Sequence, residues 1–388
     1  MRRSLRDLDV ARKRVLVRAD LNVPIDAYGA IGDDSRLRAL LPTLAYLREA
    51  RAITLLCSHL GRPEGRRDMR FTLAPVARRL SELALCPVLF VGDCAGEEPR
   101  IASARAQPGD VLLLENVRFY AEEEKNDPAF AADLARLADV FVNDAFGTAH
   151  RAHASTVGVA AHIPAAAGLL MEREIAALSS VLHDPARPLV GIVGGAKIST
   201  KIDIVRNLIG VVDTLCIGGA MALTLIAARG GRIGRSLVEP AAYEVAREIL
   251  AEAGSRLALP TDAVAALSID AAETRIVSAA EVPDDFAGFD VGPATVEAWS
   301  PAIASARTIV WNGPLGAYER PPYAAGTRAV AKRVAASSAQ SIVGGGDLVA
   351  ALESAGLADR MTHVSTGGGA SLEFLEGKAL PGIAALEV

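Results

Sequence analysis

The 388 residues contain little of what marks several large protein classes. Acidic side chains outnumber basic ones and give a formal net charge of −5, so the chain lacks the positive field of a protein that binds nucleic acid or anionic membranes. Aromatic residues make up 4%, which argues against an aromatic-rich β-sandwich. No segment reaches the roughly 18 apolar residues that cross a bilayer. We therefore predict a cytoplasmic protein with no nucleic-acid partner and no membrane partner.

Cysteine is also scarce. The four cysteines form no C-x-x-C pair, and they are Cys57, Cys86, Cys94 and Cys216. At least three of them lie in or beside apolar runs that are predicted to be strands. This placement favours buried, reduced thiols over disulfides or a zinc site.

Short apolar runs alternate with segments of helical periodicity along the chain. Such alternation predicts parallel strands joined by crossover helices. In the first half we expect strands near Val15–Val17, Ile53–Cys57, Val88–Val91, Val111–Leu114 and Val140–Val142. In the second half we expect strands near Leu189–Val193, Thr214–Ile217, Arg256–Pro260, Thr308–Trp311, Ser341–Val343 and His363–Ser365.

A chain of this length exceeds what one hydrophobic core usually serves, which predicts two domains. Met171–Leu182 is predicted to form one helix ahead of the proline-bounded turn Asp184–Pro188, a stiff connector. We expect an N-terminal domain over 1–170, a connecting helix and hinge over 171–187, a C-terminal domain over 188–370, and a tail over 371–388 that packs back toward the N-terminal domain. The predicted fold is α/β, with two doubly wound, Rossmann-like parallel-sheet domains that face a cleft and are joined by a helical hinge.

Arginine and histidine side chains follow four of the predicted strands in the first half, and they are Arg36, His59, Arg62, Arg118, His150, Arg151 and His153. Guanidinium groups recognise carboxylate and phosphate through paired hydrogen bonds. A capped helix with surface arginines would explain the segment around Arg36 equally well, and a lone histidine is usually structural. Four strand ends with the same chemistry nevertheless predict a shared site for a small anion.

Glycine turns follow the predicted strands in the second half, at Gly194-Gly195-Ala196-Lys197, Gly344-Gly345-Gly346-Asp347 and Gly367-Gly368-Gly369. Backbone N–H groups at such helix starts bind phosphate. Lys197 and Lys201 are four residues apart, which places both ammonium groups on one face of the predicted first helical turn. Neither a Walker A loop nor G-x-G-x-x-G is present, so the pattern predicts a nucleotide site of another kind.

The residues around these sites resemble the phosphoglycerate kinase family. The matching segments run from about Val15 to Leu386 and include VRADLNVP, SHLGRP, LLLENVRF, VNDAFGTAHRAHAST, GGAKIS, WNGPLG, SIVGGGD and HVSTGGGASLEFLEGKALPG. The resemblance implies a monomeric enzyme of two lobes, one for 3-phosphoglycerate or 1,3-bisphosphoglycerate and one for ADP or ATP with Mg²⁺. It also implies that lobe closure brings the substrates together for in-line phosphoryl transfer.

The resemblance also implies a role for individual residues. Those implied to bind phosphoglycerate are Asp20, Leu21, Asn22, Arg36, His59, Leu60, Gly61, Arg62, Arg118 and Arg151. Those implied to bind the nucleotide are Gly195, Lys201, Gly292, Glu319, Gly344, Gly345, Gly346, Asp347 and Leu348, with Asp347 acting through Mg²⁺. Those implied to act on the transferred phosphoryl group are Arg36, Lys197, Gly368 and Gly369.

Two positions depart from the family pattern near the nucleotide lobe. Ala220 replaces a third glycine, and its methyl group could exclude a left-handed backbone there. Leu348 stands where a hydroxyl residue is usual, which would remove a phosphate contact. Two alternatives to an active kinase stay open: a catalytically idle protein that keeps the phosphate sites, and a different two-domain phosphotransferase. The presence of Arg36, Lys197 and Asp347 disfavours the first of these.

Overall fold

The structure, a computed structural model, describes residues 3–26 and 28–387. Its contacts divide the chain into two units. The first unit runs up to Ala176 and resumes at Ala379, whereas the second unit is Ala177–Lys378. The segment expected as a C-terminal tail is therefore shared between the units. Within the second unit, the Asn207 side chain donates a hydrogen bond to the carbonyl of Leu375 (2.6 Å).

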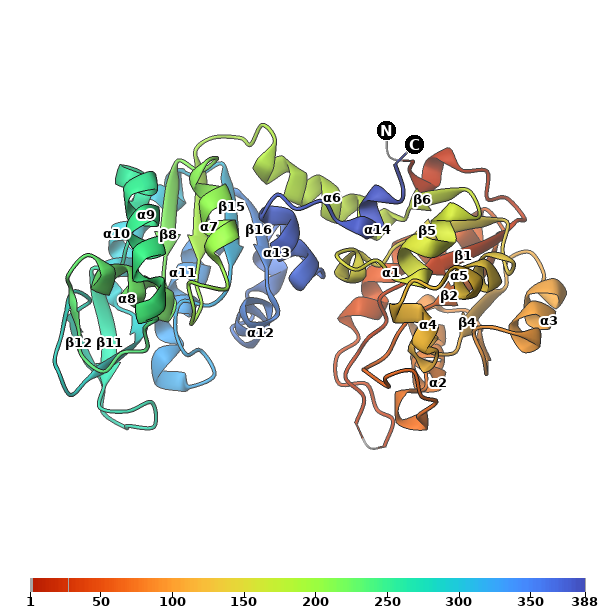
Figure 1. Ribbon diagram of the computed structural model, residues 1–388, viewed down its shortest axis with the longest axis horizontal. Coiled ribbons are helices and arrows are strands. Elements are labelled where there is room, and N and C mark those ends of the chain that lie inside the picture. Colours follow the sequence, from red (N-terminus) through yellow and green to blue (C-terminus); the bar gives the residue numbers. More distant parts are fainter. Residues whose placement is uncertain (1–2, 27, 388) are drawn as a thin grey trace. The chain divides into compact units, whose positions relative to one another are not determined.

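A six-stranded parallel sheet forms the centre of the first unit (Figure 1). Its strands are β1 (Arg14–Arg18), β2 (Ile53–Cys57), β3 (Val88–Val91), β4 (Val111–Leu114), β5 (Val140–Asn143) and β6 (Ala165–Ala167). Their spatial order is β3-β4-β2-β1-β5-β6. The five strands predicted for the first half are confirmed. The edge strand β6 was not predicted, because its three alanines lack the β-branched or aromatic side chains that mark a strand.

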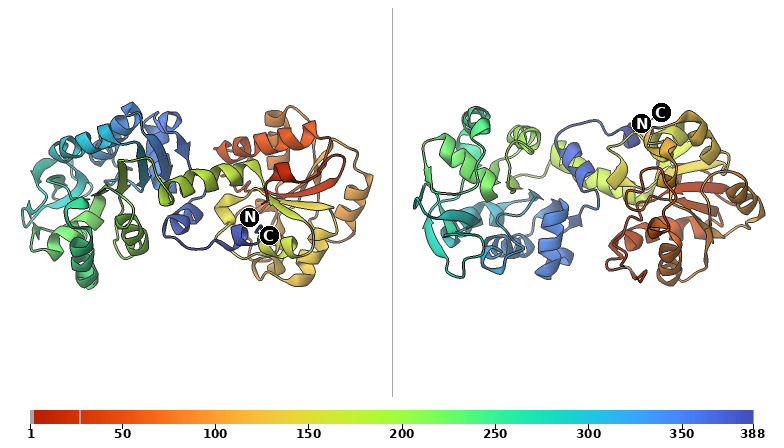
Figure 2. Two further views of the ribbon diagram at one scale, coloured as in Figure 1. Left: turned by 90° about the horizontal axis from the view of Figure 1, so that it is seen from above. Right: turned by 60° about the horizontal axis from the view of Figure 1, so that its bottom comes forward.

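Two hydrophobic cores, one on each face of this sheet, are closed by helices. These helices are α1 (Ser35–Glu49), α2 (Ala74–Ala84), α3 (Glu97–Arg105), α4 (Ala121–Glu124) and α5 (Pro128–Ala135). The last short helix, α14 (Pro381–Ala384), also packs on this unit, as both views of Figure 2 show for the blue end of the chain. The backbone N–H of Gly382 donates to the carbonyl of Ala149 (2.8 Å), which anchors α14 there.

The connecting helix α6 (Leu169–Leu182) crosses the boundary between the two units. It begins two residues before the predicted helix. The reason is a buried carboxylate: Asp144 Oδ1 accepts hydrogen bonds from the N–H groups of Leu170 (2.9 Å) and Met171 (3.1 Å). This cap satisfies donors that the first turn would otherwise leave unpaired.

The second unit contains another six-stranded parallel sheet. In spatial order its strands are β10 (Leu257–Ala258), β8 (Thr214–Ile217), β7 (Leu189–Val193), β15 (Thr308–Asn312), β16 (Gln340–Gly344) and β17 (His363–Val364). All six were predicted, with ends that differ by up to two residues. The helices are α7 (Ile202–Ile209), α8 (Gly219–Ala228), α9 (Tyr243–Ala253), α10 (Pro293–Ser305), α11 (Ala325–Ala336), α12 (Gly346–Ser354) and α13 (Gly369–Leu375). Two doubly wound parallel sheets are therefore confirmed.

A smaller antiparallel sheet in the second unit was not predicted. It consists of β11 (Asp262–Ala266), β12 (Arg275–Ser278) and β14 (Ala287–Val291). The second unit also contains a two-stranded parallel ribbon, in which β9 (Arg232–Ile233) pairs with β13 (Glu281–Val282). Strand β11 consists mainly of alanine, and β12 is largely exposed, so neither carries the apolar run that marked the other strands.

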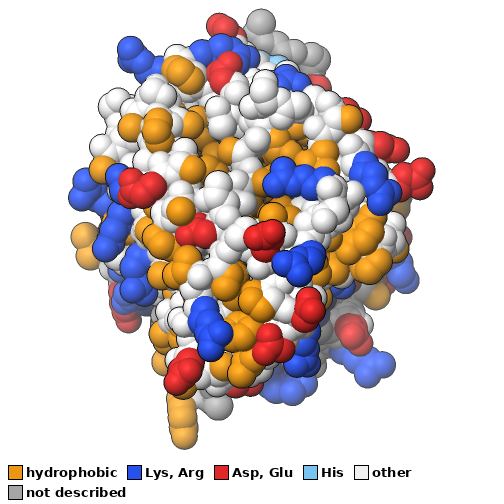
Figure 3. Space-filling view, turned by 90° about the vertical axis from the view of Figure 1, so that its left-hand side faces the viewer, with side chains coloured by type: hydrophobic (Ala, Val, Ile, Leu, Met, Phe, Trp, Pro, Cys, Tyr) orange, Lys and Arg blue, Asp and Glu red, His pale blue; other side chains and the backbone are white. Residues whose placement is uncertain are grey.

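Among the described residues, no helix is long and apolar enough to cross a membrane. Cys57, Cys94 and Cys216 are buried, Cys86 is half-buried, and all four are free thiols, as predicted. On the face drawn in Figure 3, basic and acidic side chains are interspersed. This face therefore gathers no patch of a single charge sign, in keeping with the acidic composition.

Candidate functional site

The strand ends predicted to bind an anion lie side by side in the first unit. Strands β4, β2, β1 and β5 are consecutive neighbours in the sheet and run in parallel, so their carboxyl ends share one edge. Arg118 follows β4, His59 follows β2, Asp20 follows β1 and Arg151 follows β5. The fold therefore gathers four separate sequence segments at one edge.

Side-chain to backbone hydrogen bonds tie these loops together. Asn22 Oδ1 accepts from the N–H of Gly61 (2.9 Å), and Arg118 Nη1 donates to the carbonyl of Gly61 (2.9 Å). Leu21 and Leu60 are buried in the core. These two leucines can therefore offer a ligand only their backbone groups.

The charged residues at this edge differ in exposure. Arg36 is partly buried and pairs with Asp20, with 2.5 Å between Nη1 and Oδ2. Arg62 is exposed, and Arg151 is half-buried with its Nε donating to His150 Nε2 (3.1 Å). Arg118 is buried, and burial lowers the pKa of its guanidinium, an effect that the Glu124 carboxylate opposes. Four guanidinium groups thus stand near the shared edge.

Two histidines at this edge, His59 and His153, carry no charge at neutral pH. Burial, together with the positive charges of Arg18 and Arg118, lowers the pKa of His59 well below its ordinary value. The same causes lower the pKa of His153 to about 4. The positive potential of this site therefore comes from arginine, and His59 can contribute a neutral hydrogen bond.

A cavity of about 580 Å³ opens at the carboxyl ends of the strands in the second unit. Its volume falls within the range of roughly 300–1,000 Å³ that is usual for small-molecule sites. The predicted nucleotide and phosphoryl residues that line it are Gly195, Lys197, Lys201, Glu319, Gly345, Gly346, Asp347 and Leu348. The structure therefore brings together residues that are up to 153 positions apart in the chain, from Gly195 to Leu348.

Lys201 is the partly buried cation of this cavity. Its Nζ donates to Oδ1 of Asn312, at the end of β15. Burial lowers the pKa of Lys201 to about 8, against the opposing influence of the Asp347 and Glu376 carboxylates. Because a nearby phosphate would favour the charged ammonium, Lys201 is suited to respond to an anionic ligand.

The prediction that Lys197 and Lys201 share the first turn of a helix was wrong. Helix α7 begins only at Ile202, and Lys197 lies in the preceding loop. A distant contact holds this loop out of the helix: Ser199 donates from its N–H (3.1 Å) and from its hydroxyl (2.5 Å) to the carboxylate of Glu239. Lys197 is exposed at the cavity wall.

The glycine turn after β16 ends in the N-terminus of α12. Gly345 has a φ of 98°, a left-handed conformation that favours glycine, and Gly346 is the first residue of the helix. Asp347 follows, and its exposed side chain lines the cavity. Free N–H groups and a carboxylate therefore face the same cavity.

These residues fit Mg²⁺ bound through a nucleotide. Within 3–26 and 28–387, no group of three or more His, Cys, Asp or Glu side chains is arranged to hold a metal ion. Mg²⁺ usually keeps several waters and takes one or two carboxylates together with substrate phosphates. Asp347 supplies one such carboxylate beside the phosphate-binding turn.

Some predicted residues lie outside the cavity wall. Gly292 is buried at the start of α10, where an added Cβ would lie 2.3 Å from the Asp262 carboxylate, so this position has no room for a side chain. Gly344 ends β16 behind the wall. Gly368, with a φ of 51°, and Gly369 begin α13. The structure does not bring these four glycines to the cavity.

Several residues of the cavity wall were missed. They include Leu237, Ile269, Gly288, Phe289, Asn312 and Tyr318. Gly288 and Phe289 belong to β14, in the antiparallel sheet that the sequence did not reveal. These side chains give the cavity an apolar part, which suits a flat base more than a phosphate.

The two departures from the family pattern are mild. The left-handed residue of the glycine turn after β8 is Gly219 (φ 70°), and Ala220 takes an ordinary helical conformation in α8. The expected backbone conflict at Ala220 is therefore absent. Leu348 is fully buried and packs in the core of the second unit while it borders the cavity, so it stabilises the turn from behind.

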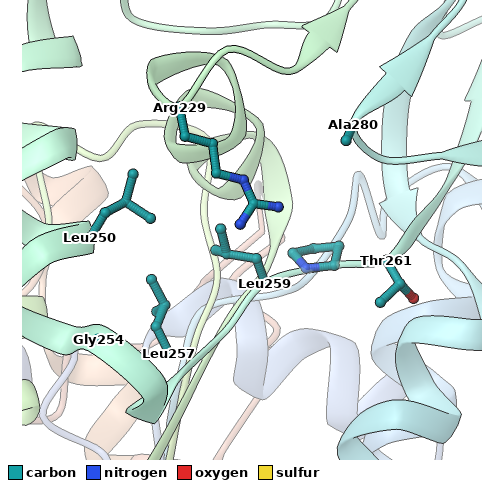
Figure 4. Close-up of a pocket in the computed structure, with 8 residues that line it drawn as sticks. Arg229, Leu250, Gly254, Leu257, Leu259, Thr261 and Ala280 are labelled. Atoms are coloured by element: carbon teal, nitrogen blue, oxygen red, sulfur yellow. The ribbon is translucent and has the colours of Figure 1, made fainter.

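A second cavity of about 450 Å³ lies elsewhere in the second unit (Figure 4). Arg229 points into it among Leu250, Leu257 and Leu259. None of the residues predicted to bind substrate or nucleotide lines this second cavity. Its lining has one basic side chain, the exposed Arg229, whereas the strand-end cavity has Lys197 and Lys201.

Comparison with known proteins agrees with this arrangement. The family model described as "Phosphoglycerate kinase" matches residues 5–378. The phosphoglycerate kinase of Desulforudis audaxviator is 52% identical over 390 residues, covering 100% of this chain and 99% of that protein. The phosphoglycerate kinase of Moorella thermoacetica is 53% identical over 387 residues, covering 99% of this chain and 98% of that protein.

Two solved structures share the whole fold. The structure of phosphoglycerate kinase from Coxiella burnetii superposes with a TM-score of 0.92 at 44% identity and covers 100% of this chain and 99% of its own. The crystal structure of phosphoglycerate kinase from Pyrococcus horikoshii OT3 superposes with a TM-score of 0.86 at 34% identity. The match covers 99% of this chain and 98% of that chain.

Proposed function

The chain belongs to the phosphoglycerate kinase family, and from that premise we propose which of its residues carry out the reaction. The reaction is the reversible transfer of the acyl phosphate of 1,3-bisphosphoglycerate to ADP, which yields ATP and 3-phosphoglycerate. The enzyme is a kinase, so two anionic substrates must be bound and the charge of one moving phosphoryl group must be stabilised.

We propose that the strand ends of the first unit bind the phosphoglycerate. The proposed ligands are Asp20, Asn22, Arg36, His59, Arg62, Arg118 and Arg151, with backbone groups of Leu21, Leu60 and Gly61. Arginine supplies two-pronged recognition of both the carboxylate and the phosphate ends of this substrate. The hydrogen bonds that Gly61 makes with Asn22 and Arg118 support this proposal, because they hold the loops in a fixed relation before any ligand binds.

The cavity of the second unit is the proposed nucleotide site. The ammonium of Lys201 and the N–H groups of Gly345 and Gly346 would meet the phosphates, and Glu319 would accept from ribose hydroxyls. Gly195, Gly292, Gly344 and Leu348 are proposed to shape the site rather than to donate charge. Phe289 and the other apolar wall residues would meet the base.

Mg²⁺ is the proposed cofactor, held by Asp347 together with the nucleotide phosphates. When bound, the ion neutralises phosphate charge and orients the chain of phosphates. Asp347 contributes by being exposed at the N-terminus of α12, where a carboxylate is also favoured by the helix dipole.

The transfer step needs positive charge and position more than it needs a base. The attacking group is an oxygen of ADP, or the carboxylate of 3-phosphoglycerate in reverse, and both are already ionised. Arg36 and Lys197 are proposed to flank the phosphoryl group as its charge spreads over three oxygens, with the amides of Gly368 and Gly369 behind it. Because the two proposed sites lie on separate units, we expect closure of the units to complete the site and to keep water from the acyl phosphate.

One observation carries the residue assignment: the cavity of about 580 Å³ that joins Lys197 and Lys201 to a free helix N-terminus and the Asp347 carboxylate. The test is a coupled assay with 3-phosphoglycerate, MgATP, glyceraldehyde-3-phosphate dehydrogenase and NADH. Loss of NADH that depends on both substrates is expected from the wild-type protein and should disappear in Lys197→Ala. Full turnover in the variant would overturn the role of Lys197.

A monomer in the cytoplasm is the remaining part of the proposal. Its support is the family alone. Sedimentation equilibrium at micromolar concentration would test this. A monomer gives a mass of 40.4 kDa, whereas a dimer gives twice that mass.

A further inference from the structure

Two oppositely charged side chains are fully buried beneath the proposed phosphoglycerate site. Arg18 ends β1, and Glu123 lies on α4; both have 0% exposure. Neither is among the proposed ligands. A buried charge without a partner costs several kcal/mol, so such a pair persists only when its geometry is well satisfied.

A hydroxyl group links the two charges. Ser155, also fully buried, lies in the turn Ala154–Gly158, which packs on α4. Arg18 Nε donates to Ser155 Oγ (2.7 Å), and Ser155 Oγ donates to Glu123 Oε1 (2.6 Å). The Ser155 N–H donates to the other oxygen, Glu123 Oε2 (2.9 Å). Both carboxylate oxygens are thus held by one residue, and that residue holds Arg18.

The other end of Arg18 reaches the proposed substrate ligand His59. Arg18 Nη2 lies 3.3 Å from His59 Nδ1. Arginine has donors only, so Nδ1 must accept this hydrogen bond. His59 is neutral, as shown above, and a neutral imidazole carries a single proton. That proton is therefore on Nε2, which leaves a fixed donor at the far side of the ring.

We propose that Glu123 is a positioning residue: acting through Ser155, it holds Arg18 against His59 and so fixes His59 as the Nε2–H tautomer that donates to phosphoglycerate. The inference rests on the proposed binding role of His59, and it adds a residue that touches no substrate. If the guanidinium turned away, either ring nitrogen of His59 could carry the proton, and part of the population would present an acceptor to an anion.

The position of Glu123 supports this role over a purely structural one. Glu122 and Glu124 on the same short helix are exposed, whereas Glu123 alone turns inward. His153 Nδ1 also lies 3.8 Å from Glu123 Oε1, so the carboxylate faces the same cluster from a second side.

The first test reads the tautomer directly, without substrate. Long-range proton–nitrogen NMR correlation of the six histidines distinguishes the two neutral tautomers, and His59 is assigned by its loss in His59→Asn. The wild-type spectrum is expected to show Nε2–H for His59. Ser155→Ala and Glu123→Gln are expected to give a mixture of tautomers, whereas Glu122→Gln, which removes the same charge from the exposed neighbour, leaves the signal unchanged. An Nδ1–H signal in the wild type, or an unaltered signal in both buried variants, overturns the proposal.

The second test measures steady-state kinetics of the same variants. A mixture in which about half of the population keeps the Nε2–H tautomer predicts a rise of about twofold in the KM for 3-phosphoglycerate, with the KM for MgATP and kcat little changed. Equal increases in both KM values would indicate general damage and would refute the positioning role. A tautomer change with unaltered KM supports the positioning but refutes the assignment of His59 to the substrate. Ser155→Ala removes one hydroxyl and no charge, so it decides the question if Glu123→Gln fails to fold.

Discussion

Raising the pH from 7 to 9 should weaken nucleotide binding, because Lys201 loses its proton in this range. Partial burial lowers the pKa of Lys201 to about 8. In the free protein its ammonium is therefore about 90% protonated at pH 7 and about 10% protonated at pH 9. A bound phosphate favours the charged form and moves the pKa back toward the ordinary 10.5. Binding at pH 9 must then draw a proton from solution.

The size of the effect follows from this linkage. The dissociation constant of MgADP is multiplied by the reciprocal of the fraction of free Lys201 that is protonated. This factor is about 1.1 at pH 7 and about 11 at pH 9. MgADP should therefore bind about tenfold more weakly at pH 9, a difference of about 1.4 kcal/mol. The nucleotide phosphates do not contribute, because their last pKa of about 6 lies below the range.

Isothermal titration calorimetry in buffers of different ionisation enthalpy measures both quantities. We expect an uptake of about half a proton at pH 8 and about 0.9 at pH 9. Lys201→Arg is the matched control, since its guanidinium stays protonated throughout and should bind MgADP with no pH slope. Wild-type protein that binds MgADP without proton uptake at pH 8 to 9, or that shares its slope with Lys201→Arg, would refute the reasoning.

Three further predictions address the other parts of the molecule. Lys197→Ala should lower kcat by several orders of magnitude and keep both substrate affinities within about tenfold, because its exposed ammonium acts on the moving group; a near-normal kcat in stopped-flow assays would exclude this. Arg151→Ala should raise the KM for 3-phosphoglycerate far more than the KM for ATP. The control Arg229→Ala, in the separate cavity, should change neither KM. Equal effects of Arg151→Ala on both KM values would refute the assignment of one substrate to each unit. Asp290, on β14, is buried and accepts hydrogen bonds from the N–H groups of Gly326 (2.7 Å) and Val291 (2.9 Å), and burial raises its pKa to about 7. The protonated Asp290 carboxyl contributes its full stabilisation below the unfolded-state pKa of 3.8, and this stabilisation is lost as the pH rises through about 7. The unfolding free energy of the wild type, minus that of Asp290→Asn, should therefore fall by on the order of 2 kcal/mol between pH 5 and pH 8. If urea titrations at the two pH values gave the same difference, the prediction would be contradicted.

Sequence alone could predict the two parallel sheets because most of their strands are buried on both faces. Strands such as Ile53–Cys57 and Leu189–Val193 are mostly apolar runs with every residue buried, and polar residues or glycine follow them. Such runs are typical of parallel sheets covered by helices. The antiparallel sheet could not be predicted, for the opposite reason. Arg275–Ser278 is largely exposed, and its pairing with Asp262–Ala266 depends on contacts between segments that the local sequence pattern does not indicate.

The start of α7 shows a second limit. The sequence around Lys197 has the spacing of a helical turn, yet the Ser199 contact with Glu239, forty residues further along the chain, keeps it a loop. A long-range hydrogen bond can outweigh local helix preference because that preference amounts to less than about 1 kcal/mol per residue. Lys197 and Lys201 still lie at one cavity, since the order of the strands places them there regardless of how the loop is folded.

The protonation of the phosphoglycerate site lies furthest beyond prediction from local sequence. His59 and Arg118 suggest two cations when each is considered beside its own strand. In the fold, Arg18 and Arg118 both act on the buried His59 and keep it neutral, while the compensating carboxylate comes from Glu123 on another helix. The charge that attracts the substrate therefore resides on guanidinium groups alone. It follows that affinity for phosphoglycerate should stay nearly constant between pH 6.5 and pH 8, although the site contains a histidine whose ordinary pKa lies at the edge of that range.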